Sequence, residues 1–194
     1  MPDYPFHLAG LNVKVHKMAV VVAPENMILG SNIIVDDFVF LGFHQRLILG
    51  NYVHIASHSS ITGGGRVLMS DFSGLASGVR LLSGSDDYTG SALTNPTVPM
   101  EFRNVRRGTI VLEPHVIIGS NAVVFPDVTI GEGSSVAAGS VVTRSLKPWG
   151  VYAGMPARLV KSRPRDLLLD NERRLFEKYG RPSVEYRSAA CLDR

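Results

Sequence analysis

The sequence predicts an all-β solenoid with one long inserted loop and one C-terminal helix. Aliphatic residues recur every six positions over much of the chain, one polar stretch interrupts this rhythm, and helix-forming residues gather near the end. With 194 residues, 45% of them hydrophobic, the chain is large enough to bury a core as one compact domain with an appendage.

The six-residue period is clearest from Leu112 onward, where the chain divides into LEPHVI, IGSNAV, VFPDVT, IGEGSS and VAAGSV. A helix does not fit this period, because its apolar stripe recurs every three to four residues. Short strands with a bend every six residues do fit: the leading aliphatic side chain points inward, and Gly or Asn supplies the positive φ of the corners. Three such strands close one coil, and stacked coils form a hexapeptide β-helix.

The repeat runs backward, less regularly, so we expect coils over about residues 28–148. It breaks after Leu81, within RLLSGSDDYTGSALTNPTVP, and returns near Ile110. A loop of more than about 15 residues inside a repeat array is more often functional than not. We expect a solenoid domain over 1–162, with an inserted loop at about 83–109, followed by a helix and tail over 163–194.

The C-terminal helix is expected to follow Pro164, a favoured first helical position, and to end at Gly180. Repeat arrays need their ends capped, so we expect this helix to cover the open end of the solenoid. The first 20 residues are too irregular to assign.

Composition excludes several classes of function. The net charge is only +3 and basic residues are spread out apart from 158–174, which disfavours nucleic-acid binding. The single cysteine, Cys191, rules out an intramolecular disulfide or a thiolate metal cluster within the chain. The first residues, MPDYPFHLAG, do not show a basic region followed by an apolar stretch, so we expect no leader sequence, and no apolar run reaches the roughly 20 residues needed to span a bilayer. We therefore expect a soluble, cytoplasmic protein.

The stretch IGSNAVVFPDVTIGEGSSVAAGSVVT, followed by VYAGMPARLVK, resembles the signature of the hexapeptide-repeat acyltransferases, which include galactoside, serine and xenobiotic acetyltransferases. The resemblance covers most of the chain. It implies a left-handed parallel β-helix, a homotrimer, and acetyl-CoA bound along the groove between neighbouring solenoids. It also assigns coenzyme contacts to Ser120, Ala138, Thr143, Arg144, Arg158 and Lys161. The cations among them suit the phosphates of the coenzyme.

Acetyl transfer from a thioester needs a base for the attacking group and a donor for the oxyanion. Many sugar-modifying and xenobiotic members carry a catalytic histidine where this chain has Ser85 or Asp86, so the expected histidine is absent. Asp86 or Asp87 is one replacement: a carboxylate with a pKa near 4 is a weak base for a sugar hydroxyl but suffices for an amine. The same two acids equally fit a solvated turn that they cap.

The other replacement is a histidine from elsewhere, and His54 ranks first among the six. As the last residue of LGNYVH it is expected at a corner, facing the 80–99 loop of a neighbouring chain, where an aspartate orients its imidazole. His58 and His44 rank below it, and His115 last. Residues expected to bind the acceptor are His58, Tyr88 and Asn95.

The sequence therefore predicts an acetyl-CoA-dependent acetyltransferase that modifies a hydroxyl or amino group of a sugar or nucleotide sugar for a surface polysaccharide. The alternative is a non-catalytic trimeric scaffold or binding protein, which the absent loop histidine favours. A zinc-dependent hexapeptide-repeat carbonic anhydrase is disfavoured, because strand geometry does not bring His54 and His58 together. No metal is expected.

Overall fold

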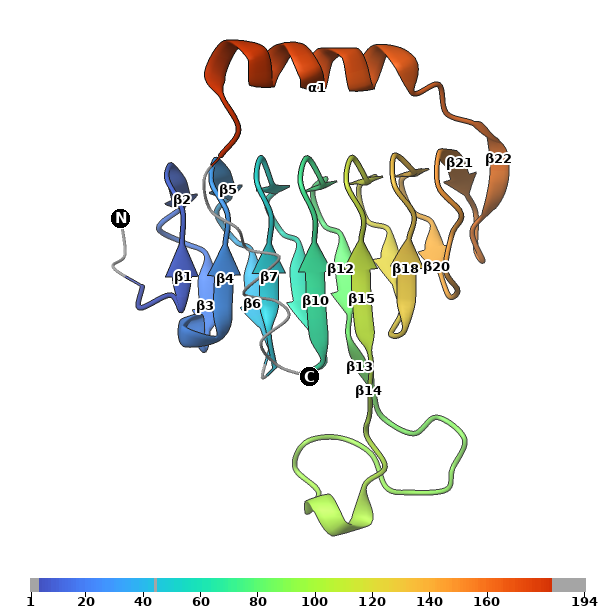
Figure 1. Cartoon of the computed structure of the whole chain (residues 1–194). Helices are drawn as coiled ribbons and strands as arrows, with labels where there is room; N and C mark the ends of the chain where they lie inside the picture. The colour runs from blue at the N-terminus through green and yellow to red at the C-terminus, as the bar shows by residue number, and fades with distance from the viewer. Residues whose placement is uncertain (1–3, 44, 183–194) are drawn as a thin grey trace.

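The structure is a computed structural model that describes residues 4–43 and 45–182. In these residues, three sheets of six, eight and six strands run along one solenoid, with an inserted loop and one α-helix attached (Figure 1). Strands within each sheet pair in parallel, except that the last strand of the second sheet is antiparallel to its neighbour. The predicted fold class is confirmed.

Successive strands of the chain go to the three sheets in turn, except for the two strands of the inserted loop and the last two strands. The first sheet holds β1 (Leu8–Ala9), β4 (Met27–Leu29), β7 (Leu47–Leu49), β10 (Arg66–Met69), β15 (Thr109–Leu112) and β18 (Val128–Ile130). The second holds β2 (Val13–Val15), β5 (Ile33–Val35), β8 (His54–Ile55), β11 (Gly74–Leu75), β16 (Ile117–Ile118), β19 (Ser135–Val136), β21 (Gly150–Ala153) and β22 (Arg158–Ser162). The third holds β3 (Val20–Val22), β6 (Phe40–Gly42), β9 (Ser60–Thr62), β12 (Arg80–Leu82), β17 (Val123–Val124) and β20 (Val141–Val142). A 3-10 turn, η1 (Pro24–Asn26), precedes β4.

The core is the column of inward aliphatic side chains that the repeat predicts. The leading residues of the six-residue blocks are at most 3% exposed: Leu112, Ile118, Val124, Ile130, Val136 and Val142. The coils begin earlier than expected, because β1, β2 and β3 form a coil before residue 28. That coil escapes prediction because its strands are short and much of its surface is exposed.

Positive φ values at the corners come from Asn, as expected, and also from aromatic residues. Asn32 and Asn121 have φ values of 61° and 59°, but Tyr52, Phe72 and His115 adopt 58° to 62° as well. A bulky residue with positive φ is uncommon. Here the rings of successive coils stack, with centroids 4.9 Å apart from Tyr52 to Phe72 and again from Phe72 to His115. Ring stacking offsets the backbone cost.

Helix α1 (Asp166–Tyr179) begins two residues after Pro164, and it ends as predicted, with Gly180 as its C-cap. It runs back along one edge of the solenoid, across several coils (Figure 1). The ring of Phe176 lies 6.4 and 5.8 Å from those of Tyr52 and Phe72, and Glu172 Oε2 is 3.0 Å from His115 Nε2. The prediction that α1 covers the open end is therefore wrong. The helix packs on the stacked corner rings of Tyr52 and Phe72, and the six-residue period does not predict this contact.

The inserted loop leaves the solenoid after β12 and returns at β15, on the edge opposite α1 (Figure 1). Its two ends are joined by an antiparallel pair, β13 (Gly84–Ser85) with β14 (Arg106–Arg107), and it contains a 3-10 turn, η2 (Met100–Phe102). This short ladder fixes the position at which the chain enters the loop after Ser85.

Candidate functional site

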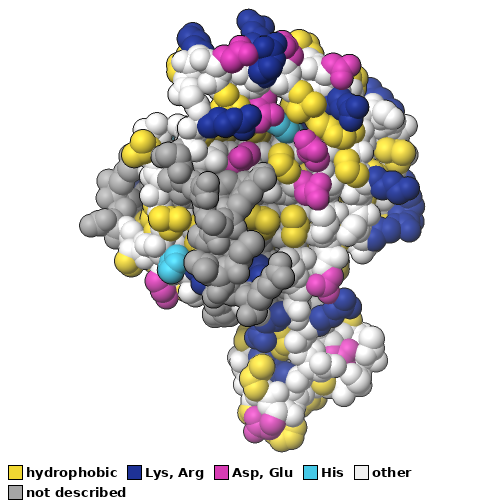
Figure 2. All heavy atoms as spheres, viewed as in Figure 1, with side chains coloured by type: hydrophobic (Ala, Val, Ile, Leu, Met, Phe, Trp, Pro, Cys, Tyr) yellow, Lys and Arg dark blue, Asp and Glu magenta, His cyan; other side chains and the backbone are white. Residues whose placement is uncertain are grey.

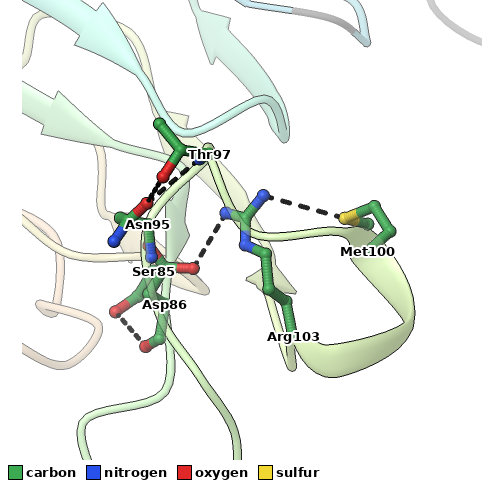
Figure 3. Close-up of polar contacts among 6 residues, drawn as sticks. All are labelled: Ser85, Asp86, Asn95, Thr97, Met100 and Arg103. Atoms are coloured by element: carbon green, nitrogen blue, oxygen red, sulfur yellow. Dashed lines mark hydrogen bonds and ion pairs between the residues drawn. The ribbon is translucent and has the colours of Figure 1, made fainter.

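Asp86 is held at the base of the inserted loop by residues from the other half of that loop. Arg103 Nη2 donates to Asp86 Oδ1 at 3.0 Å, and the backbone N–H of Asn95 donates to Oδ2 at 3.2 Å. Figure 3 shows the Arg103 guanidinium pointing across to Asp86. The hydrogen bond from Arg103 lowers the pKa of Asp86 below its usual value, so its carboxylate is charged at neutral pH.

Asp87 has both carboxylate oxygens occupied within the loop. Oδ1 accepts from the backbone N–H and hydroxyl of Thr89, and Oδ2 accepts from the backbone N–H and hydroxyl of Ser91 and from the N–H of Ala92, all within 2.8 Å. The hydroxyls of Ser91 and Thr89 hold the pKa of Asp87 well below its usual range. A carboxylate so engaged is a poor base, and its geometry favours the turn-capping interpretation.

The lowered pKa of Asp87 gives a testable pH dependence. The charged form contributes its full stabilisation of the 87–92 turn above the ordinary pKa of 3.8, and this contribution is lost only as pH falls below that value toward the lowered pKa. We expect the Ser91 and Ala92 amides to keep their hydrogen-exchange protection at about pH 5. Asp87→Asn should reduce that protection at neutral pH, whereas the remote Asp37→Asn should not. Equal protection in wild type and Asp87→Asn would contradict this role.

A cavity of about 660 Å³ joins the base of the loop to the last coils. The loop supplies Asp86, Asp87 and Tyr88, and the corner after β20 supplies Thr143 and Arg144. The structure thus brings together five residues predicted from the sequence as catalytic, acceptor-binding or coenzyme-binding. On the same rim, Arg106 Nη2 forms an ion pair with Asp127 Oδ2 at 2.6 Å, which lowers the pKa of Asp127.

Asn95, in contrast, does not line this cavity. Its side-chain oxygen accepts from the backbone N–H and the hydroxyl of Thr97, so it stabilises the loop (Figure 3).

His54 lies in β8, not at a corner, because this strand begins one residue before its inward aliphatic residue, Ile55. Its side chain is 53% exposed, and Nε2 is 3.0 Å from Asp36 Oδ2. The sequence had suggested an aspartate from a neighbouring chain, whereas Asp36 belongs to the same chain. Asp36 follows β5, which pairs directly with β8. Aligning consecutive coils in the sequence could therefore have identified Asp36 as the partner of His54.

A second cavity, of about 470 Å³, lies on the outer surface of the second sheet and includes His54 and Ser120. Ala138 is adjacent, since the backbone N–H of Gly139 donates to the carbonyl of Ser120. His58 lines neither of these two cavities: it sits at a corner with its ring stacked on Phe38 at 5.1 Å. His44 and Cys191 lie outside the described residues.

The remaining coenzyme candidates, Arg158 and Lys161, are exposed on β22. Figure 2 shows Lys and Arg side chains gathered at this end of the solenoid. Within one chain, the predicted catalytic and coenzyme-binding residues therefore fall into three places, the loop cavity, the His54 cavity and the basic edge strand, whereas Asn95 and His58 lie outside them.

Two general features of residues 4–43 and 45–182 bear on function. They contain no cluster of three or more His, Cys, Asp or Glu residues suited to a metal ion. Their one α-helix is too short and polar to cross a membrane.

Comparison with known proteins identifies the family. The model of the bacterial transferase hexapeptide (six repeats) matches residues 109–144. A dTDP-4-amino-4,6-dideoxy-D-glucose acyltransferase from Escherichia coli is 37% identical over 169 residues, which is 87% of this chain and 88% of that protein.

Solved structures of AntD, an N-acyltransferase from Bacillus cereus, share the architecture. A variant in complex with dTDP and coenzyme A has a TM-score of 0.84 and 36% identity, covering 89% of this chain and 92% of that one. AntD in complex with dTDP and 3-hydroxybutyryl-CoA has a TM-score of 0.83 and 35% identity, with the same coverage. The chain belongs to the hexapeptide-repeat acyltransferases.

Proposed function

We propose that the protein transfers an acyl group from a CoA thioester to an amino group of a nucleotide-linked sugar. The observation that carries the proposal is the loop cavity, in which a charged Asp86 held by Arg103 faces the same space as Arg144. The near full-length similarity to acyltransferases whose names or complexes include dTDP-linked amino sugars and CoA supports the same acceptor and donor. Of the two acceptor groups that the sequence left open, these relatives favour the amine.

A neighbouring cavity of about 390 Å³ suits the nucleotide part of the acceptor. It is lined by Arg103 and Arg107 and by Gly63 and Gly64. Both glycines have positive φ, which favours glycine, and a Cβ at Gly63 would lie only 2.1 Å from the backbone nitrogen of Gly84. Guanidinium groups are well matched to phosphate oxygens, so a sugar diphosphate fits this cavity. Asp86 lines this cavity as well as the larger one, so it stands between the diphosphate and the donor.

In the proposed mechanism His54 is the general base and Asp36 positions it. Asp36 accepts a hydrogen bond from Nε2–H, so Nδ1 is the nitrogen left free to take a proton. The amine nitrogen attacks the thioester carbonyl, a C–N bond forms, and the C–S bond breaks. His54 takes the proton from nitrogen and returns it to the departing thiolate.

Assembly into the homotrimer would complete this site, because His54 and the loop cavity are built from different coils and sheets of one chain. Apolar side chains on the outer surface of the third sheet support self-association: Val20, Phe40 and Val22 are 39% to 50% exposed. As part of the same proposal, the enzyme works in the cytoplasm, draws on acetyl-CoA or a related thioester, and supplies sugars for a surface polysaccharide.

The test is acyl transfer from acetyl-CoA to a panel of nucleotide-linked amino sugars, with the matching hydroxy sugars as controls. We expect amide formation only with the amino sugars, detected by mass spectrometry and by release of free CoA thiol. Transfer to the hydroxy sugars alone would shift the proposal to ester formation. No transfer to either set would favour the scaffold alternative.

A further inference from the structure

The second sheet carries a row of outward side chains, one from each coil, and this row has one gap. Parallel pairing in register aligns the residues as Lys14, Ile34, His54, Gly74, Ile117, Ser135 and Val151. Adjacent strands are about 4.8 Å apart. Gly74 therefore leaves a notch directly beside His54, with the half-exposed Ile117 on its other side.

Nothing in the backbone requires glycine at position 74. Its φ is outside the left-handed region, and a Cβ there would meet only the His54 carbonyl oxygen, at an ordinary 3.7 Å. β11 pairs in continuous register with β8 and β16, so no bulge explains it. Gly119, by comparison, has no room for a side chain, because a Cβ added there would lie 2.5 Å from the Ala138 nitrogen.

Glycine inside a strand weakens the strand, and where no bend or bulge is present it often marks a place where a ligand or another backbone approaches closely. The ligand has a defined space here, since the notch is the floor of the cavity of about 470 Å³ that His54 lines. Ile117 stands on one side of Gly74, and the cavity is also lined by the apolar Ala56 and Ala76 and by the polar Ser73, Ser77 and Ser120. An acyl thioester suits this site, because its apolar chain can fill the notch while its reactive carbonyl lies beside the histidine–aspartate pair.

We infer that the notch at Gly74 receives the acyl group of the CoA thioester, and that the size of residue 74 limits the length of acyl group transferred. This inference rests on the proposed function and deepens it by assigning the acyl subsite. Gly74 is then a specificity-determining residue. Ile117 forms the opposite wall of the notch, so a smaller residue at position 117 should allow a longer acyl chain to bind.

The test is direct binding of CoA, acetyl-CoA, butyryl-CoA and hexanoyl-CoA by calorimetric titration, which needs no acceptor. For the wild type we expect affinity to rise by up to about fourfold for each CH₂ group buried. Gly74→Val should bind CoA as the wild type does but lose the gain from the acyl chain. Lys14→Val places the same side chain on the same row, away from the notch, and should change nothing.

Val is favourable in strands, so Gly74→Val should fold; Gly74→Ala is the milder second variant, and circular dichroism checks both. An acyl-dependent gain that survives in Gly74→Val, or that is missing in the wild type, overturns the inference. Failure of the proposed function looks different: the acyl-dependent gain is present and sensitive to residue 74, but no sugar is acylated.

Discussion

His54→Gln is expected to lower kcat/KM for acyl transfer by about 100-fold or more, because general-base catalysis by a positioned side chain contributes roughly 10²- to 10⁴-fold. Glutamine keeps a polar side chain of similar reach but cannot take up the proton. Binding of CoA should be unchanged, since the loss falls on the chemical step. The measurement is a steady-state assay with an amino-sugar acceptor, paired with a CoA titration.

The chain offers a matched control in His16, whose Nδ1 lies 3.7 Å from Asp37 Oδ2 on the same solenoid. His16→Gln also removes a partly exposed histidine beside an aspartate, and it should retain full activity. If His54→Gln is as active as His16→Gln, His54 is not the base, and Asp86 becomes the candidate. Asp36→Asn separates positioning from catalysis, because it should alter the pH profile of kcat and leave KM for CoA unchanged.

Leu75→Ala is expected to destabilise the protein by about 2–5 kcal/mol, the usual cost of truncating a fully buried leucine. Leu75 is 1% exposed and points into the core from the residue next to Gly74. For a chain of this size, that loss lowers the Tm by about 5 °C or more. Thermal and urea unfolding, followed by circular dichroism, measure it.

Leu159→Ala is the control, because Leu159 is 62% exposed on β22. An exposed substitution of this kind changes stability by less than about 0.5 kcal/mol. A similar Tm for the two variants would mean that the inward column is not the source of stability. Because Leu75 and Gly74 are consecutive residues on opposite surfaces of one strand, the two sites should respond independently: one in folding, the other in acyl-chain preference.

The sequence predicts the core well because one physical requirement repeats. Every sixth residue must point inward, so Leu112, Ile118 and the residues that follow them in the column are recognisable without a structure. Outward neighbours do not follow from that period. They depend on the length of each coil, and the inserted loop changes it: Gly74 pairs with His54 on one side and with Ile117, beyond the insertion, on the other.

The candidate site was predictable to the same limited extent. Asp86, Asp87 and Tyr88 were recognisable because the loop interrupts the repeat, but the sequence did not predict that they line one cavity with Thr143 and Arg144. Their hydrogen-bond partners were not recognisable, since Arg103 and Asn95 reach Asp86 only through the folded loop. Asp36 escaped for a related reason: its contact with His54 arises between coils.

The backward course of α1 has a consequence for how the molecule unfolds. In a repeat array each coil contacts only its neighbours, so such proteins can lose coils one at a time from either end. Here Phe176 packs on Tyr52 and Phe72, while Glu172 pairs with His115. These contacts connect the C-terminal segment to coils far earlier in the chain. The last coils can therefore unfold together with α1 only if its contacts with the middle coils also break. In this way the helix makes the unfolding of a one-dimensional stack cooperative.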